Sequence, residues 1–229
     1  MGCPQDGLCD VDRNVVGPAM EIADTTADDV AAIVFTSGST GPPKGVVYRH
    51  QNFAAQVDAI RDAYDIKPGE VNLPTFPLFA LFDPALGMTT VVPDMDPTRP
   101  ARVDPSKIIE PIREHGVTIM FGSPALLDTV GRWGAERGVN LESVRCVISA
   151  GAPVPPRVIE RFQSLLRDDA AIHTPYGATE SLPVATISSH EILAETGLDR
   201  AAAQVVKSVP GCRFVLAGAA AHEGYARKI

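Results

Sequence analysis

The sequence contains few cysteines, no cluster of basic residues and no long hydrophobic run. Its four cysteines, Cys3, Cys9, Cys146 and Cys212, include no C-x-x-C pair, so their spacing indicates neither a zinc site nor a disulfide framework. A chain without such a framework is expected in a reducing compartment, here the cytoplasm. No apolar run approaches the roughly 20 residues that cross a bilayer, so we expect no transmembrane segment.

The charge balance disfavours one class of partner. The formal net charge is -8, and no group of lysines or arginines offsets it. Because the phosphates of nucleic acid would be repelled, we expect no nucleic acid as a partner. Hydrophobic residues make up 45% of the chain and charged residues 21%, which suits a globular enzyme with one sizeable core.

The most informative segment is residues 36–45, which directly follow the apolar run of residues 31–35. Glycines let the backbone turn its N–H groups inward, hydroxyl side chains add donors, and a lysine adds a mobile positive charge. These residues are Thr36, Ser37, Gly38, Ser39, Thr40, Gly41 and Lys44. The segment is not a Walker loop, because Pro43 precedes the lysine and Gly45 follows it. We predict a phosphate-binding loop, and a flexible Ser/Gly connector is the alternative.

Strand-like and helix-like segments alternate along the rest of the chain. Apolar runs predict strands at residues 31–35, 46–48, 89–92, 117–121, 144–148 and 170–172. Apolar residues at helical spacing predict helices over residues 52–64, after caps at Asp104 and Ser123, and over residues 156–166. This alternation predicts an α/β fold with a mostly parallel sheet and flanking helices. Loops that leave the carboxyl ends of parallel strands meet in one crevice, where we expect the site.

Three motifs, in order along the chain, carry a resemblance to a known superfamily. Residues 36–45 resemble the phosphate-binding signature of the adenylate-forming synthetases, which include acyl-CoA ligases, peptide-synthetase adenylation domains and luciferases. Residues 176–180, Tyr-Gly-Ala-Thr-Glu, are similar to the second nucleotide motif of these enzymes. Residues 149–153, Ser-Ala-Gly-Ala-Pro, resemble their adenine-pocket loop. The chain is therefore expected to be part of the large N-terminal domain of an adenylate-forming enzyme.

The resemblance implies a role for each motif. The residues of the first motif would hold the β and γ phosphates of ATP. The residues that would surround the adenine are Gly151, Ala152, Pro153, Tyr176 and Gly177, with the tyrosine ring stacked on the base. Thr179 would donate its hydroxyl to the α phosphate, and Glu180 would hold Mg²⁺, which prefers carboxylate and phosphate oxygens. The alternatives are a solvated helix cap for Glu180 and a core aromatic for Tyr176.

Residues 76–82 point to the acid substrate, because this segment is unusually aromatic and apolar. Many acyl-CoA ligases have histidine after the corresponding Pro-Leu-Phe, whereas this chain has Ala80. With residues 83–88 and 93–100, the segment resembles one subgroup, the β-lactone synthetases of bacterial long-chain olefin biosynthesis. Phe76, Phe79, Ala80 and Phe82 would line the acyl pocket. The alternative is that the three phenylalanines, spaced three apart, pack one helix face into the core.

In that subgroup a long-chain β-hydroxy carboxylic acid is activated as the acyl-adenylate, and its own hydroxyl then closes a β-lactone with release of AMP and pyrophosphate. The implied cofactors are ATP and Mg²⁺. The implied partners are the small-molecule carboxylic acid and other enzymes of a hydrocarbon pathway. An acyl-CoA ligase is the alternative, since it differs only in letting a thiol attack the same intermediate.

The resemblance covers the middle of a longer enzyme. Residues 30–217 correspond to a partial adenylation domain, whereas residues 1–29 form an acidic, irregular segment and residues 218–229 an unmatched tail. We expect the chain to lack the Thr-Gly-Asp motif that binds the ribose hydroxyls, and the C-terminal lid domain with its catalytic lysine. A non-catalytic nucleotide-binding fragment is therefore a third interpretation.

Overall fold

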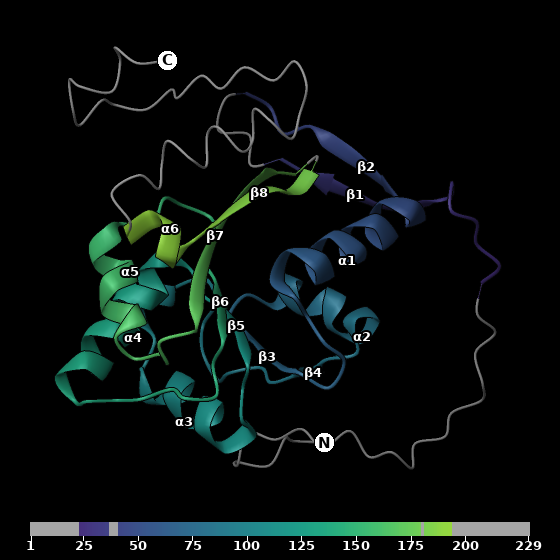
Figure 1. Cartoon of the computed structure of the whole chain (residues 1–229). Helices are drawn as coiled ribbons and strands as arrows, with labels where there is room; N and C mark the ends of the chain where they lie inside the picture. Colours follow the sequence, from purple (N-terminus) through teal and green to yellow (C-terminus); the bar gives the residue numbers. More distant parts are fainter. Residues whose placement is uncertain (1–22, 37–40, 180, 194–229) are drawn as a thin grey trace, which may run out of the picture.

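The computed structural model describes residues 23–36, 41–179 and 181–193, which form a two-stranded sheet and a six-stranded sheet with helices on both faces (Figure 1). The strands are β1 (Val30–Phe35), β2 (Gly45–Arg49), β3 (Val71–Pro74), β4 (Thr89–Thr90), β5 (Ile119–Phe121), β6 (Cys146–Ile148), β7 (Ala171–Ala178) and β8 (Ser181–Ser188). The α-helices are α1 (His50–Tyr64), α2 (Asp83–Leu86), α3 (Ser106–His115), α4 (Pro124–Glu136), α5 (Pro156–Gln163) and α6 (Ser189–Leu193). Two 3₁₀ helices, η1 (Pro77–Phe82) and η2 (Pro100–Arg102), complete the described elements. None of the helices in this part of the chain has the length and apolar character needed to cross a membrane.

The larger sheet confirms the predicted α/β class. Its strand order is β4-β3-β5-β6-β7-β8, and every neighbouring pair is parallel except β7 and β8. The central register places Met120 opposite Val147 and Val147 opposite Ile172. The carboxyl ends of β3, β5 and β6 therefore lie along one edge of the sheet, as the sequence predicts for the edge that carries the site.

The main core lies between the sheet and the helices α3, α4 and α5. Ile108, Ile112, Leu127 and Phe162 are completely buried there. The α4 helix begins as predicted, because the Ser123 hydroxyl accepts a hydrogen bond from the Leu126 N–H (3.3 Å). Each large apolar side chain contributes about 1.5–3 kcal/mol when it is fully buried, so this face provides most of the hydrophobic stabilisation.

The opposite face of the sheet carries a smaller core beneath α1 and α2. Tyr64, Ile66 and Leu86 pack there against Ile119 and Cys146 of the sheet. The helix α1 of this face begins directly after β2 and so connects the face to the two-stranded sheet (Figure 1).

Three strands differ from the sequence-based expectation. The apolar run at residues 31–35 forms β1, but β1 pairs antiparallel with β2 and does not join the parallel sheet. The connection of residues 36–44 is too short for parallel strands, which need a crossover of about a dozen residues or more. The strands β3 and β8 are missed by the hydrophobic pattern, because Asn72 and Pro74 interrupt the first and Pro183 and Thr186 the second.

Candidate active site

The predicted phosphate loop lies between β1 and β2. Two hydrogen bonds close its base, from the Thr36 N–H to the Lys44 carbonyl (3.0 Å) and from the Lys44 N–H to the Thr36 hydroxyl (3.1 Å). Gly41 and Lys44 are exposed, and a side chain added at Gly41 would meet no atom within 4 Å. The predicted ligands Ser37, Gly38, Ser39 and Thr40 lie outside the described residues. The described part of the loop is thus fixed at its base and open to solvent.

The predicted adenine loop leaves β6 at the carboxyl edge of the parallel strands. The Ser149 N–H donates to the carbonyl of His173 in β7 (2.9 Å), which ties the start of the loop to the sheet. Gly151 has a φ of 93°, a left-handed conformation that glycine adopts at low cost. Gly151, Ala152 and Pro153 are all exposed. The backbone of this loop is accessible to a ligand, as flanking an adenine requires.

The second nucleotide motif lies on a ribbon that extends beyond the parallel strands. The β6–β7 pairing ends at His173, and from Thr174 onward β8 is the strand that pairs with β7 within the described residues. Tyr176 and Gly177 therefore lie within a strand, although the sequence predicts a loop there, and the register shifts between Tyr176 and Ala178. Tyr176 is 58% exposed, which does not fit the core-aromatic alternative. Stacking of this ring on adenine stays a prediction.

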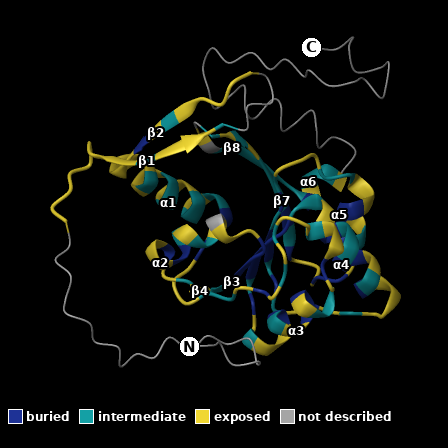
Figure 2. Ribbon diagram, turned by 180° about the vertical axis from the view of Figure 1, so that it is seen from behind, coloured by how far each residue is buried: buried dark blue, intermediate teal, exposed yellow. Residues whose placement is uncertain are grey.

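Tyr48 joins the hairpin to this ribbon. Its buried hydroxyl donates to the carbonyl of Thr179, which lies in the turn after β7, and accepts from Nε2 of Gln56 in α1 (3.3 Å). In both views the β1–β2 hairpin lies next to the end of the β7–β8 ribbon (Figures 1 and 2). The hairpin that carries the phosphate loop is thus joined to the second nucleotide motif, although 131 positions separate Tyr48 from Thr179.

A cavity of about 270 Å³ opens beside the contact of Tyr48 with Thr179. It lies between β2, one face of α1 and the start of β8. Its described lining consists of Val46, Val47, Tyr48, Asn52, Ala55, Gln56, Ala59, Ser181 and Pro183. The two alanines of α1 leave the space, and the amides and hydroxyls around it supply a few polar atoms. Its lining is therefore mixed, with polar atoms beside apolar side chains.

The aromatic segment of residues 76–82 points in two directions. Phe79 stacks on Phe121 at the carboxyl end of β5 (ring centroids 3.9 Å apart), and Phe76 lies beside Phe79. Phe76 is 41% exposed and Phe79 is 37% exposed. Phe82 instead faces α1, where its ring lies 6.3 Å from that of Phe53. The three phenylalanines therefore do not pack one helix face into the core, and Ala80 within this segment is half-buried.

Buried polar groups fix both ends of this segment. The Thr75 hydroxyl donates to the Phe121 carbonyl (2.8 Å) before it. The Asp83 carboxylate accepts from the amide of Asn72 (3.0 Å to each oxygen) and from the hydroxyl of Thr90 (2.6 Å) after it. Burial raises the pKa of Asp83 above its ordinary value, and these hydrogen bonds oppose that rise. The exposed rings are thus held between two anchored ends.

Two aromatic side chains beneath the ribbon also titrate abnormally. The rings of Tyr64 and His173 meet edge to face, with centroids 5.2 Å apart. Burial lowers the pKa of His173 and raises the pKa of Tyr64 to about 12. Both side chains are therefore favoured in their neutral forms at neutral pH.

The predicted magnesium ligand, Glu180, lies outside the described residues. In the part of the chain that is described, no three His, Cys, Asp or Glu side chains are grouped so that they could hold a metal ion. The assignment of Glu180 to Mg²⁺ therefore stays a prediction.

Sequence reasoning missed the cavity between β2, α1 and β8. A signal was present, because Asn52, Ala55, Gln56 and Ala59 recur at the spacing that places residues on one helix face. Amides that alternate with alanines on one face leave space beside polar groups, whereas a core-facing stripe is filled by large apolar side chains.

The sequence of this chain matches a known protein family. The AMP-binding enzyme family matches residues 5–223. This chain is a member of that family. It is 54% identical over 204 residues to an olefin beta-lactone synthetase of Xanthomonas campestris, and 55% identical over 171 residues to one of Stenotrophomonas maltophilia. These matches cover 87% and 75% of this chain but 36% and 30% of the relatives, so it spans about a third of their length.

Solved structures agree on the fold. An o-succinylbenzoate coenzyme A synthetase from Bacillus subtilis, solved in complex with ATP and magnesium ion, matches with a TM-score of 0.60 at 26% identity. The match covers 75% of this chain and 36% of that one. The structure of VinN matches with a TM-score of 0.61 at 20% identity, over 74% of this chain and 42% of that one. This chain therefore has the fold of adenylate-forming enzymes.

Proposed function

We propose that this chain supplies the nucleotide-binding and acid-binding part of an enzyme that activates a long-chain β-hydroxy carboxylic acid with ATP and closes it to a β-lactone. The observation that carries the proposal is the hydrogen bond from Tyr48 to Thr179. It joins the hairpin of the phosphate loop, the candidate ligand of the α phosphate and an open cavity. The names of the two bacterial relatives support the choice of product.

ATP would lie between the hairpin and the carboxyl edge of the sheet. The Thr36 hydroxyl accepts from the Lys44 N–H, so it keeps its own proton to donate to a phosphate oxygen. The Lys44 ammonium and the hydroxyls of the loop would hold the β and γ phosphates. Residues 151–153 would flank the adenine, and the exposed ring of Tyr176 would stack on it. Mg²⁺, held by Glu180 and phosphate oxygens, would stabilise the charge of the departing pyrophosphate.

In the first step, a carboxylate oxygen of the acid would attack the α phosphorus, and pyrophosphate would leave. The Thr179 side chain would donate to an oxygen of the α phosphate, where negative charge develops. The position suits this role because Tyr48 already fixes the Thr179 carbonyl and thereby the backbone that carries the hydroxyl.

In the second step, the β-hydroxyl oxygen would attack the acyl carbon and form the ring C–O bond. The bond from that carbon to AMP would break, and the hydroxyl proton would be released. The reaction is intramolecular, which favours it, although ring strain removes part of the gain and water must stay out. The contacts Phe76–Phe79 and Phe53–Phe82 would supply apolar walls for this step.

Product analysis tests the reaction. We expect a longer protein that contains this chain to convert ATP, Mg²⁺ and a long-chain β-hydroxy acid to a β-lactone, AMP and pyrophosphate, with no effect of coenzyme A. The chain as printed is assayed beside it, because it spans only about a third of its relatives. A thioester formed in the presence of coenzyme A would contradict lactone closure and support the acyl-CoA ligase.

The magnesium site has its own test. Replacing Glu180→Gln removes charge while keeping shape and one acceptor oxygen, so it should abolish the magnesium dependence of ATP binding more than the binding itself. ATP titrations with and without Mg²⁺ measure this, and Glu142→Gln, at an exposed position before β6, is the control. An identical magnesium response in wild type and Glu180→Gln would favour the helix-cap alternative.

We also infer that the enzyme works in the cytoplasm beside other enzymes of a hydrocarbon pathway. The reasons are the cysteine spacing of the sequence and the names of the relatives. Cell fractionation and co-purification with those enzymes test the two inferences separately.

A further inference from the structure

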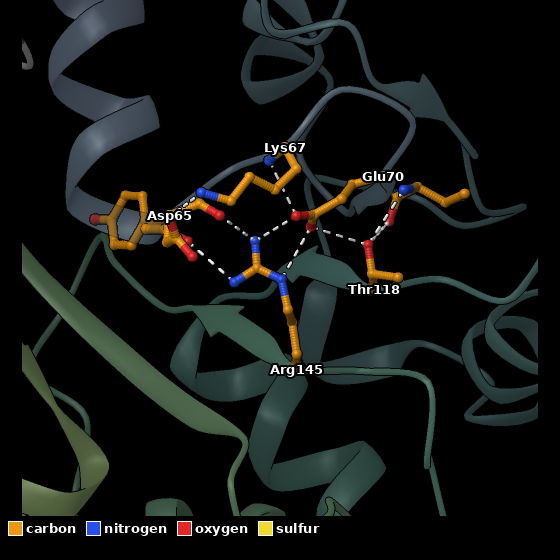
Figure 3. Close-up of polar contacts among 7 residues, drawn as sticks. Asp65, Lys67, Glu70, Thr118 and Arg145 are labelled. Atoms are coloured by element: carbon orange, nitrogen blue, oxygen red, sulfur yellow. Dashed lines mark hydrogen bonds and ion pairs between the residues drawn. The ribbon is translucent and has the colours of Figure 1, made fainter.

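One polar network ties a helix to three strands at the amino edge of the parallel sheet (Figure 3). Arg145, Glu70 and Thr118 lie directly before β6, β3 and β5, respectively. Arg145 makes a two-pronged ion pair with Glu70, from Nη2 to Oε1 (2.6 Å) and from Nε to Oε2 (3.1 Å). The Thr118 hydroxyl donates to the same carboxylate (3.1 Å). The Arg145 and Glu70 side chains are only 28% and 12% exposed, so the pair is largely shielded from water.

The remaining donors of Arg145 hold the end of α1. Nη1 donates to the Tyr64 carbonyl (3.0 Å), and Nη2 donates to the Asp65 carbonyl (3.0 Å). Carbonyl groups at a helix C-terminus have no partner within the helix and attract positive charge. Only the planar guanidinium reaches Glu70 and both carbonyls at once, because a lysine ammonium is a single point of donors.

The other end of α1 is attached to the β1–β2 hairpin on both sides. β2 continues directly into α1. On the β1 side, the His50 N–H donates to the Asp29 carbonyl (3.1 Å) and the Gln51 N–H to the Ala27 carbonyl (3.1 Å). The Gln51 amide also donates to the Asp28 carboxylate (2.9 Å). The hairpin therefore follows the position of the first turn of α1.

Arg145 connects two elements, here called arms, that each lead to a part of the candidate site. One arm is α1, whose 15 residues span about 22 Å to the hairpin of the phosphate loop. The other arm is β6, whose three residues span about 10 Å to the adenine loop. A tilt of about 5° at the clamp would move the far end of α1 by about 2 Å, since the displacement grows with helix length.

We propose that Arg145 is a positioning residue that sets the distance between the β1–β2 hairpin, which carries the phosphate loop, and the adenine loop. Glu70 holds the guanidinium in the required orientation. The proposal rests on the proposed ATP site, and it concerns only the ligand that must span both loops. ATP would contact the phosphate loop and the adenine loop together, whereas AMP lacks the β and γ phosphates. Loosening the clamp therefore weakens ATP binding more than AMP binding.

Calorimetric titration with ATP plus Mg²⁺ and with AMP tests this in the chain as printed. We expect the wild type to bind ATP more tightly than AMP. In both Arg145→Lys and Glu70→Gln the ratio of the two affinities should fall about threefold or more, with AMP affinity changed less than about twofold. Circular dichroism confirms that each variant is folded. Arg161→Lys is the matched control, because it makes the same replacement in a half-buried pair with Asp128 (2.8 Å) between α5 and α4 and should keep the ratio.

An unchanged ratio in both clamp variants would overturn the proposal, whether the two nucleotides bind as in the wild type or are weakened equally. Loss of folding in both variants would overturn it too, since the network would then serve stability alone. A wild type that binds neither nucleotide, or that binds AMP as tightly as ATP, would overturn the proposed ATP site and the positioning role with it.

Discussion

The strands β1 and β5 are both short apolar runs, yet they lie in opposite environments. All three residues of β5 are buried, whereas β1 is exposed at every position except the half-buried Ala32. Figure 2 shows this contrast as dark central strands and a largely yellow hairpin. The strand β5 has a neighbour on each side and helices on both faces, and β1 has only β2 beside it within the described residues. Hydrophobicity thus predicted that both runs are strands, but not which one is buried.

The same contrast separates stability from ligand contacts. The packed region of the sheet with α3, α4 and α5 holds the fully buried side chains, and the hairpin with the end of the β7–β8 ribbon holds most of the candidate ligands. Substitutions in the first region should change the free energy of unfolding, and substitutions in the second should change the affinity for ATP. Matched pairs of variants test whether the two quantities separate in this way.

The largest expected effect is on unfolding. Phe162→Ala removes the largest fully buried side chain of the main core and should cost about 3–5 kcal/mol of stability, because a cavity remains. Phe35→Ala, at a position that is 67% exposed, should change stability by less than about 0.5 kcal/mol. Urea unfolding curves measure both. Similar losses would mean that β1 contributes to a core and that the contrast between the regions is wrong.

Next in size is the effect of the loop lysine on ATP affinity. Lys44→Ala should weaken ATP binding by about 1.5–3 kcal/mol, the scale of a hydrogen bond to a charged group, and leave the unfolding curve unchanged. Lys107→Ala, which removes an exposed lysine paired with Asp94 on α3's side of the sheet, is the control for net charge. Equal ATP affinity in Lys44→Ala and wild type would remove the loop from the site.

Tyr48→Phe sharpens the comparison, because Tyr48 is a buried residue within the largely exposed hairpin. Loss of its hydrogen bonds to Thr179 and Gln56 should cost about 0.5–1.5 kcal/mol of stability. We also expect weaker ATP binding, since the hairpin is no longer tied to the ribbon. Ser164→Ala removes a hydroxyl that donates to the Arg161 carbonyl (2.7 Å) in α5, and should affect stability alone. Unchanged ATP affinity in Tyr48→Phe would separate hairpin position from nucleotide binding.

The smallest effect concerns acid stability. Burial lowers the pKa of His173 below its ordinary value of 6.5, and the nearby charges of Glu191, Arg145 and His190 modify that shift. As the pH falls through that ordinary value, the unfolded chain binds a proton before the folded chain does, so stability decreases. His173→Gln should therefore reduce the loss of melting temperature between pH 7 and pH 5. His115→Gln, at the end of α3, is the control, and an identical loss in wild type and His173→Gln would contradict the prediction.

Much of the fold was predictable, because strong periodic patterns also dominate the packing. The stripe of Ile108, Ile109 and Ile112 and the cap at Ser123 gave helices at the expected places. The strands β3 and β8 were not predictable, because polar residues and proline break their apolar runs, and β3 also pairs with β5, which is distant in the sequence. Strand pairing depends on neighbours in space, which local patterns do not contain.

For the site, the motifs were recognisable and their arrangement was not. Nothing local indicates that β7 continues past His173 and carries Tyr176 on a ribbon, or that Tyr48 reaches the Thr179 carbonyl. The two directions of the aromatic segment were not predictable either. Phe79 packs on Phe121 and Phe82 on Phe53, and both partners belong to other elements. The roles of these residues toward ATP and the acid stay predictions.

The contact between Tyr48 and Thr179 also constrains the order in which the chain can fold during its synthesis. A ribosome adds about 5–20 residues per second, so the 131 positions between these residues correspond to about 7–26 s of synthesis. Both strands of the hairpin are made before most of the sheet exists, and β1 and β2 can pair locally on a microsecond scale. The joint between hairpin and ribbon can close only after β7 has been translated. The candidate site is therefore among the last parts of the described chain to fold during synthesis.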